Sequence, residues 1–440
     1  MIMSRVYISF LGTNDYLPCT YFHDEKELQN IRFVQEATLH FFCNEWDIND
    51  RILIFATDES YQTNWLDNGH KDRKTGDTKK CNGLKYCIEK SQLQAEVQKI
   101  SIPKGQSEQE IWEIFQIVYD QLKPGDEVIF DITHAFRSIP MLAIVILNYA
   151  KTIKDVTLSG IYYGAFEVLG SYYEAEKLST EKRRAPILDL TAFDQLMEWS
   201  IAIDRFTGSG DAGLVSKLAN QSVKKLLAIS KGQDKAAANV RDIAKNLSAF
   251  SKTMATCRGR DISVIAGKLK ENVNRLETIE IIRPFKPVFE RIKEQFDKFQ
   301  GNPVLDGIQA TKWCIEHNLI QQGYTILQET LISYFVIKTG ENEEDKKYRE
   351  IASQATVIHL REIDKGKWKK PAADNCQITQ KFLNLYGGEK KLIKIFRNLS
   401  RDRNDLNHAG QNDSPMKPDN FRKKIEKYIE DIKILMPVSK

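Results

Sequence analysis

The sequence predicts a two-domain protein, an α/β domain followed by an all-α domain, with the change near residue 190. Short, continuously apolar runs alternate with helical patterns over the first 190 residues, as expected of a parallel sheet covered on both faces. Beyond that point the strand pattern fades and apolar residues recur at helical spacing. We therefore expect a Rossmann-like domain with a parallel-sheet core over residues 1–190 and an all-helical domain over residues 191–440.

Individual strands are expected where β-branched and aromatic residues run continuously, and helices where apolar residues follow the helical period. The polar stretch 58–82, rich in Lys, Asp, Asn and Gly, is expected to be a long loop. The predicted strands are 5–11, 51–57, 127–133, 156–166 and 171–176, and the predicted helices of the first domain are 25–42, 108–122 and 138–149. The predicted helices of the second domain are 191–206, 211–230, 234–254, 262–297, 306–338, 377–399 and 418–435.

The composition is that of an ordinary globular protein, with 42% hydrophobic residues, 28% charged residues and a net charge of +4. A charge this small excludes a chain that is polybasic throughout. Residues 391–440, however, carry twelve Lys or Arg against seven Asp or Glu. This basic segment suits attraction of a polyanion, and it equally suits the solvated face of amphipathic helices; both readings stay open.

The seven cysteines form no CxxC pair and are odd in number, which argues against a zinc cluster or a disulfide framework. We expect no bound metal. The N-terminus starts as a strand rather than with a signal-peptide pattern, and the longest apolar run, Ile139–Leu147, is too short to span a bilayer. We therefore expect a cytoplasmic protein without a membrane partner.

Two polar loops are candidates for a ligand site, because open α/β sheets bind ligands beyond the carboxyl ends of their strands. In the loop after strand 5–11, Gly12 would let the backbone approach a ligand, and Thr13 and Asn14 supply short polar groups. Neither GxGxxG nor a Walker A lysine motif is present, which disfavours a nicotinamide dinucleotide or P-loop site.

The second loop lies between strand 127–133 and the next helix, and it contains Thr133, His134 and Arg137. A helix N-terminus binds anions through its free N–H groups, and Arg137 would add a charge-assisted contact. The two loops together predict a nucleotide or phosphate site. The alternative is structural: Thr133 and Ser138 would only cap the helix, and Asp131 would be a satisfied acid at a strand end.

The candidate catalytic segment of the helical domain is RNDLNH (403–408). The apolar stripe before it predicts a core-facing position for Arg403, and an arginine is almost never fully buried without a partner. His408 lies about 140° around an ideal helix from Arg403, whereas Asn404 shares a face with His408. A distorted helix end or a partner chain would be needed to bring Arg403 and His408 together.

These residue types suit RNA cleavage without a metal, since histidine can take or give a proton and arginine can neutralise charge growing on a phosphate. The alternative is that Arg403 makes a structural salt bridge and His408 interacts with the helix dipole.

The combination of these motifs resembles a known family. LGTNDYLPCTYF (11–22) and FDITHAFRSIP (130–140) resemble the two signature loops of CARF domains in type III CRISPR accessory proteins. KWCIEHNLIQQGYTILQET (312–330) and RNLSRDRNDLNHAG (397–410) resemble the helical core and the RxxxxH motif of their HEPN domains. The resemblance covers both halves in the expected order, while residues 200–300 match no motif of either domain.

The resemblance implies a CARF ligand-sensing domain over residues 1–190 that binds a cyclic oligoadenylate. It also implies a HEPN domain over residues 191–440 that cuts single-stranded RNA without a metal and leaves 2′,3′-cyclic phosphate ends. Cyclic tetra-adenylate is favoured over hexa-adenylate, because the loop pattern is closer to that branch. By match to the motifs, the ligand contacts would be Gly12, Thr13, Asn14, Thr133, His134 and Arg137, and the nuclease site would be Arg403, Asn404 and His408.

Family members are homodimers, so the resemblance further implies a ligand on the twofold axis and two RxxxxH motifs meeting in one composite site. Such an enzyme is allosteric, since the ligand must favour the active arrangement. Two other functions stay open: a non-catalytic regulator whose helical half binds nucleic acid or a partner, and a CARF domain that also cleaves its own ligand through Thr13, Thr133 or His134.

Overall fold

The computed structural model describes residues 4–67, 70–71, 75–79, 81–133, 139–276 and 286–436. The chain divides into two compact units, Met1–Gln195 and Leu196–Lys440, which are described separately. The first unit is built on a sheet, and the second is helical among its described residues.

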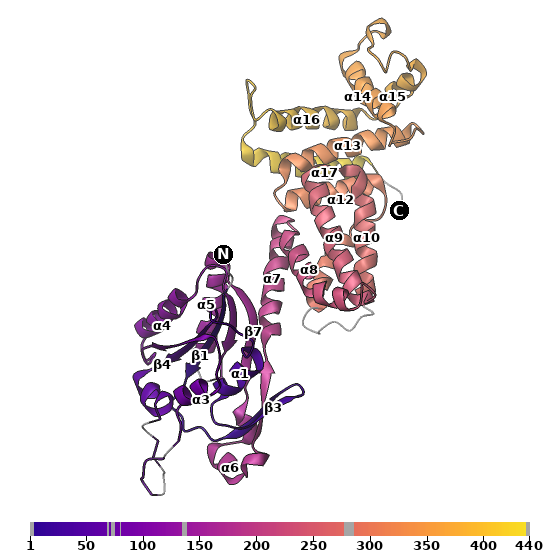
Figure 1. Cartoon of the computed structure of the whole chain (residues 1–440). Helices are drawn as coiled ribbons and strands as arrows, with labels where there is room; N and C mark the ends of the chain where they lie inside the picture. The colour runs from indigo at the N-terminus through magenta and orange to yellow at the C-terminus, as the bar shows by residue number, and fades with distance from the viewer. Residues whose placement is uncertain are drawn as a thin grey trace. The chain divides into compact units, whose positions relative to one another are not determined.

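The sheet of the first unit has eight strands in the order β3-β2-β8-β7-β6-β1-β4-β5 (Figure 1). The pairs that join β5, β4, β1, β6 and β7 are all parallel, which confirms the predicted parallel-sheet core, and β7 pairs antiparallel with β8 on its other side. The chain passes from β1 to β4 on one side and later returns to β6 on the other, so the order switches between β1 and β6. In open sheets this switch point is where ligands bind. The strands are β1 Arg5–Leu11, β2 Cys19–His23, β3 Lys26–Ile31, β4 Arg51–Ala56, β5 Glu96–Ser101, β6 Glu127–Asp131, β7 Thr157–Gly164 and β8 Arg184–Asp189.

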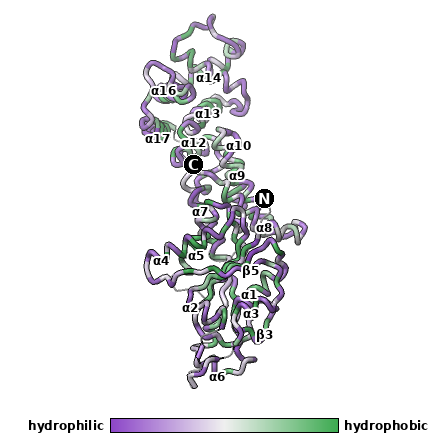
Figure 2. The backbone as a smooth tube through the Cα atoms, turned by 60° about the vertical axis from the view of Figure 1, so that its left-hand side comes forward, coloured by the Kyte–Doolittle hydropathy of each residue, from purple (hydrophilic) through white to green (hydrophobic). Residues whose placement is uncertain are grey.

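Successive side chains of a strand point to opposite faces, so a continuously apolar strand has apolar side chains to bury on both faces of the sheet. Helices cover both of these faces. Tyr7 and Ile52 pack in one cluster with α1 (Val34–Phe42) and α3 (Leu84–Lys90). Val6 and Phe130 pack in another with α4 (Glu108–Gln121) and α5 (Ile139–Lys154). In Figure 2 much of α5 is green, the colour of hydrophobic residues.

Three predictions for this unit were wrong. The predicted helix 25–42 begins only at Val34, because the preceding residues form the antiparallel β2–β3 hairpin. The predicted strand 171–176 is α6 (Tyr172–Lys177), whose start is stabilised by a capping box between Ser171 and Glu174. The predicted loop 58–82 contains α2 (Asp58–Ser60) and the π-helical turn η1 (Tyr61–Trp65).

The second unit confirms the predicted largely helical region. Two predicted long helices are broken, 306–338 at His317 and 377–399 at Glu389, and α14 was not predicted. None of the described helices is both long and apolar enough to cross a bilayer. The helices are α7 Thr191–Ser209, α8 Gly213–Ile229, α9 Lys235–Ala255, α10 Gly259–Leu276, α11 Lys286–Phe296, α12 Pro303–Glu316, α13 Ile320–Lys338, α14 Lys346–Arg361, α15 Cys376–Gly388, α16 Lys390–Asn407 and α17 Pro418–Leu435.

Candidate functional site

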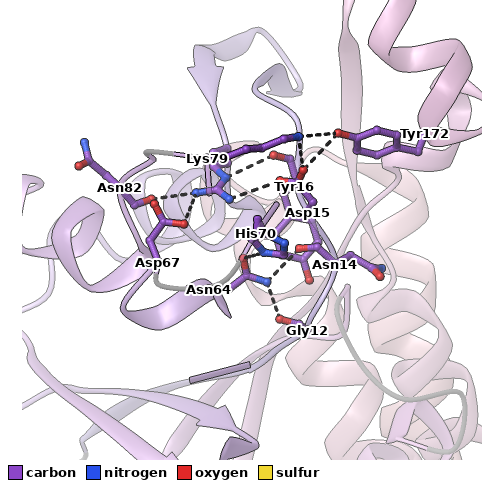
Figure 3. Close-up of polar contacts among 11 residues, drawn as sticks. Gly12, Asn14, Asp15, Tyr16, Asn64, Asp67, His70, Lys79, Asn82 and Tyr172 are labelled. Atoms are coloured by element: carbon purple, nitrogen blue, oxygen red, sulfur yellow. Dashed lines mark hydrogen bonds and ion pairs between the residues drawn. The ribbon is translucent and has the colours of Figure 1, made fainter. Parts of the chain in front are cut away.

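The loop after β1 lies at the switch point of the sheet, and a side chain from another segment of the chain holds its backbone. The Asn64 side chain on η1 is fully buried, and its Nδ2 donates to the carbonyl oxygens of Gly12 and Asn14 at 2.8 and 2.9 Å. Its Oδ1 then faces His70 Nε2 at 2.8 Å, which makes that nitrogen the donor (Figure 3). One asparagine thus fixes the backbone of the loop, while the side chains of Thr13 and Asn14 are exposed.

A charged network continues from this loop (Figure 3). Asp15 accepts a hydrogen bond from Lys79 at 2.5 Å and one from the Tyr172 hydroxyl at 3.3 Å. Arg32, which is nine-tenths buried, lies 3.5 Å from Asp15 and donates to Asp67 at 3.3 Å. These contacts join the loop after β1 to segments near residues 67, 79 and 172.

The network favours an ionised carboxylate at Asp15. Burial alone would raise the pKa of Asp15, but the hydrogen bond and the charge of Lys79 lower it below its ordinary value. The same hydrogen bond raises the pKa of Lys79. Burial lowers the pKa of His70, which favours its neutral form, with the proton on Nε2 that is donated to Asn64.

The end of β6 is organised around Asp131, which is fully buried. Its carboxylate accepts hydrogen bonds from Tyr7 at 2.9 Å and Ser9 at 3.2 Å on β1, and from Thr38 at 3.4 Å on α1. Thr133 donates to it twice, through its backbone N–H at 3.0 Å and its hydroxyl at 2.5 Å. Burial raises the pKa of Asp131 in spite of these donors, among which Thr133 opposes the rise most.

Thr133 has little hydrogen-bonding capacity left for a ligand. Its hydroxyl donates to Asp131 and accepts from the backbone N–H of Gly164 at 2.8 Å. Thr133 therefore links the end of β6 to β7 at the edge of the site. Its hydroxyl is occupied by these two contacts. His134 and Arg137 lie outside the described residues.

The RNDLNH segment forms the end of α16, and its phase differs from the prediction. Asp402, not Arg403, occupies the buried position after Leu399. Asp402 is 1% exposed and accepts hydrogen bonds from the Tyr428 hydroxyl at 2.8 Å and from Lys424 at 3.2 Å, both on α17. Arg403, predicted to face the core, is only half-buried, and the fully buried position beside it belongs to Asp402, to which α17 offers hydrogen-bond donors.

Arg403 is half-buried, and its Nε is buried without a hydrogen-bond partner. Its Nη2 lies 3.5 Å from Asn404 Oδ1. His408 is exposed and is the C-cap of α16, with its backbone N–H bonded to the Asn404 carbonyl at 2.9 Å. Within one chain the structure thus brings the Arg403 guanidinium to Asn404, and no hydrogen bond joins Arg403 to His408 among the described residues.

Hydrogen bonds to neighbouring segments hold the C-terminal end of α16 in place. Asp405 accepts hydrogen bonds from Asn412 at 2.5 Å and from the Met416 backbone at 2.8 Å, which holds the following loop. Asn407 accepts a bond from Gln321 on α13 at 3.0 Å. An exposed histidine therefore stands on a well-anchored helix end.

Comparison with known proteins identifies the first unit. Residues 6–176 match the family model described as the CARF domain of the CRISPR system endoribonuclease Csx1. The first unit is a CARF domain. Residues 195–304 match a second model, the second domain of the CRISPR-associated protein MJ1674. MJ1674 of Methanocaldococcus jannaschii is 26% identical to the chain over 336 residues, which are 75% of this chain and 44% of that relative.

The matched stretch spans less than half the length of this relative. Together the matches support a CARF-containing CRISPR accessory protein. The stretch 200–300, which resembled no motif in the sequence, belongs to the second matched domain. The RNDLNH segment lies beyond residue 304, outside both matched models.

Several residues of the CARF domain site were missed in the sequence. Asn64, Arg32 and Lys79 reach the loop after β1 from positions far along the chain. For Asn64 and Lys79 the polar composition of residues 58–82 was the available signal, and it predicted only a long loop, while Arg32 lies outside that stretch. Local patterns report periodicity and not contacts between distant segments.

Replacing Asn64 by alanine should weaken binding of a cyclic oligoadenylate, the class of ligand that CARF domains bind, by about tenfold, because two loop carbonyls lose their shared donor. Isothermal titration calorimetry measures the affinity, and hydrogen exchange of residues 12–16 should rise in parallel. Asn82→Ala is the matched control, since only its backbone carbonyl is used, by Arg32. Equal affinities for both variants would contradict this role.

Proposed function

We propose that this protein is an endoribonuclease of type III CRISPR antiviral defence that cyclic oligoadenylate activates and that cuts single-stranded RNA without a metal. The observation that carries the proposal is the match of residues 6–176 to the CARF domain of an endoribonuclease. The RNDLNH segment on an exposed, anchored helix end supports the catalytic half.

The ligand site of the proposal is the edge between β1 and β6. Gly12 and the exposed side chains of Thr13 and Asn14 would contact the adenylate ring from the first loop. Thr133 would hold the second loop through its bonds to Asp131 and Gly164, and His134 and Arg137 would contact phosphate. Cyclic tetra-adenylate is the proposed ring size in preference to hexa-adenylate.

The proposed chemistry uses the RNA's own 2′-hydroxyl as nucleophile. Its oxygen attacks the adjacent phosphorus while His408 takes its proton, and the 5′-oxygen of the next nucleotide leaves with a proton supplied by a second acid. This produces a 2′,3′-cyclic phosphate end. Arg403 would neutralise charge on the phosphate, with Asn404 orienting its guanidinium from 3.5 Å.

A homodimer would complete both sites. The α5 helix exposes an apolar stripe that begins just after the second ligand loop and includes Met141, 74% exposed, and Ile153, 57% exposed. A second copy on this stripe would bury it and bring two sets of ligand loops together. In the helical unit, a partner would supply what one chain lacks, since Arg403 and His408 do not meet within it.

The test is an RNA cleavage assay in EDTA with cyclic tetra-adenylate or cyclic hexa-adenylate. The proposal expects single-stranded RNA to be cut only when a cyclic ligand is present, with the tetramer more effective and cyclic phosphate at the product ends. Intact RNA with both ligands, at concentrations where calorimetry shows that they bind, would refute it.

A non-catalytic regulator is the second candidate function. It is favoured by the separation of Arg403 from His408 within one chain and by the position of RNDLNH outside both matched models. In that case ligand would change the affinity of the helical unit for nucleic acid or a partner, and RNA would be bound without cleavage products.

A further inference from the structure

The second unit contains a pocket of about 320 Å³ whose charged lining consists of three lysines, Lys298, Lys312 and Lys433. Lys298 lies in the loop before α12, Lys312 is on α12, and Lys433 is in the last turn of α17. In the described part of the chain, none of the three ammonium groups forms an ion pair with a carboxylate. This arrangement gathers positive charge from three segments into one cavity.

The charges are close enough to oppose one another. Burial lowers the pKa of Lys312 to about 8, and the contact with Lys433 and the charges of Lys433 and Lys298 add to that effect. Glu316, one helical turn further along α12, opposes the shift without reversing it. Like charges held together cost free energy, and an anion between them would recover it.

The rest of the lining is suited to more than a bare ion. Leu305, Ile308 and Met436 provide an apolar wall, and the amides of Gln300 and Gln309 offer donors and acceptors. The volume lies at the lower end of the range of about 300–1,000 Å³ that is typical of small-molecule pockets. A phosphate joined to a sugar or base suits both parts of this lining. The phosphate matches the lysines, and the sugar or base matches the apolar wall and the amides.

We propose that this pocket binds a nucleotide unit, with its phosphate among Lys298, Lys312 and Lys433 and its base or ribose against Leu305, Ile308 and Met436. The unit is either a free mononucleotide or one nucleotide of an RNA strand, since both present the same chemistry. The pocket shares no residue with the CARF ligand loops or with RNDLNH, and it does not depend on the proposed nuclease activity.

The position of the pocket gives such a ligand a structural consequence. Lys298 and Gln300 belong to the stretch matched as the second domain of MJ1674, whereas Lys312 and Lys433 lie beyond it. A bound nucleotide would therefore connect that domain to the C-terminal helices and stabilise the folded second unit.

The test compares the full-length protein with the double variant Lys312→Met, Lys433→Met, and with Lys427→Met as the matched control, because Lys427 is an exposed lysine of α17 outside the pocket. The probes are adenosine monophosphate, inorganic phosphate and a short single-stranded RNA, measured by calorimetry for the small molecules and by fluorescence anisotropy for RNA. We expect the double variant to lose at least about tenfold in affinity for the nucleotide probe that binds, and the control to match the wild type.

Binding of the monophosphate but not of RNA at the pocket identifies a free nucleotide as the ligand, and the reverse identifies an RNA strand. Binding of inorganic phosphate as tightly as of the monophosphate would overturn the nucleotide assignment, and equal affinities of the double variant and the wild type for all probes would overturn the site.

Because the substitution removes like-charge repulsion, the melting temperature of the double variant should not fall. NMR of methylated lysines gives a second readout, in which the Lys312 signal of the control should titrate at higher pH once the probe is bound.

Discussion

Replacing His408 by alanine should lower the rate of the proposed ligand-activated RNA cleavage by about 10²–10⁴-fold, since the 2′-hydroxyl would lose its proposed proton acceptor. The ligand affinity and the melting temperature should stay at their wild-type values, because His408 is exposed and its recorded hydrogen bonds use only its backbone. Cleavage is measured in single turnover with saturating cyclic tetra-adenylate, and binding by calorimetry.

Gln411→Ala is the control for this variant, as Gln411 is an exposed residue just beyond His408 whose recorded bond is also a backbone one. It should cut RNA at the wild-type rate. A His408→Ala protein that cleaves as fast as the control would remove His408 from the mechanism, whatever the remaining residues do.

Replacing Asp131 by alanine should lower the free energy of unfolding of the CARF domain by about 3 kcal/mol and abolish the proposed binding of cyclic tetra-adenylate. The substitution leaves buried donors of Tyr7, Ser9 and Thr133 without their acceptor. The loss stays below the sum over these bonds, because the Tyr7 hydroxyl keeps Thr38 as a partner at 2.6 Å. Denaturant unfolding followed by circular dichroism measures the change.

Asp120→Ala is the matched control, since Asp120 is an exposed acid of α4 with a single bond from Gln116 at 2.7 Å. The pH dependence gives a second check. The folded pKa of Asp131 is raised above 3.8, so its contribution to stability is fully present below that value and declines as the pH rises through the folded pKa. The stability of the wild type relative to Asp131→Asn should therefore be greater in acidic buffer than at neutral pH, and the opposite trend would show that folding lowers the pKa of Asp131 instead of raising it.

The strands and helices that local patterns describe well were predictable. The continuous apolar runs of β1, β4, β6 and β7 and the spacing of most helices of the second unit are properties of neighbouring residues. Where patterns are weak, prediction failed: the β2–β3 hairpin is polar on its outer strand, and α6 owes its start to a capping box within an aromatic sequence typical of a strand.

The buried position on α16 shows a limit of helical periodicity. From Leu399, Asp402 lies about 60° to one side of the apolar stripe and Arg403 about 40° to the other, so the spacing permits either. Tyr428 and Lys424 on α17 donate to Asp402, and those contacts select it. Which of the two residues is buried therefore depends on contacts with α17, and the spacing of residues within α16 carries no information about those contacts.

The sequence by itself determined the class of each unit and the two loops at the edge of the sheet, because side-chain periodicity and the order of strands and helices are local properties of the chain. Only the tertiary structure decided what holds those loops and where charge gathers. Asn64 reaches Gly12 and Asn14, and Lys298, Lys312 and Lys433 line one pocket, because packing brings distant segments together and satisfies or concentrates their polar groups.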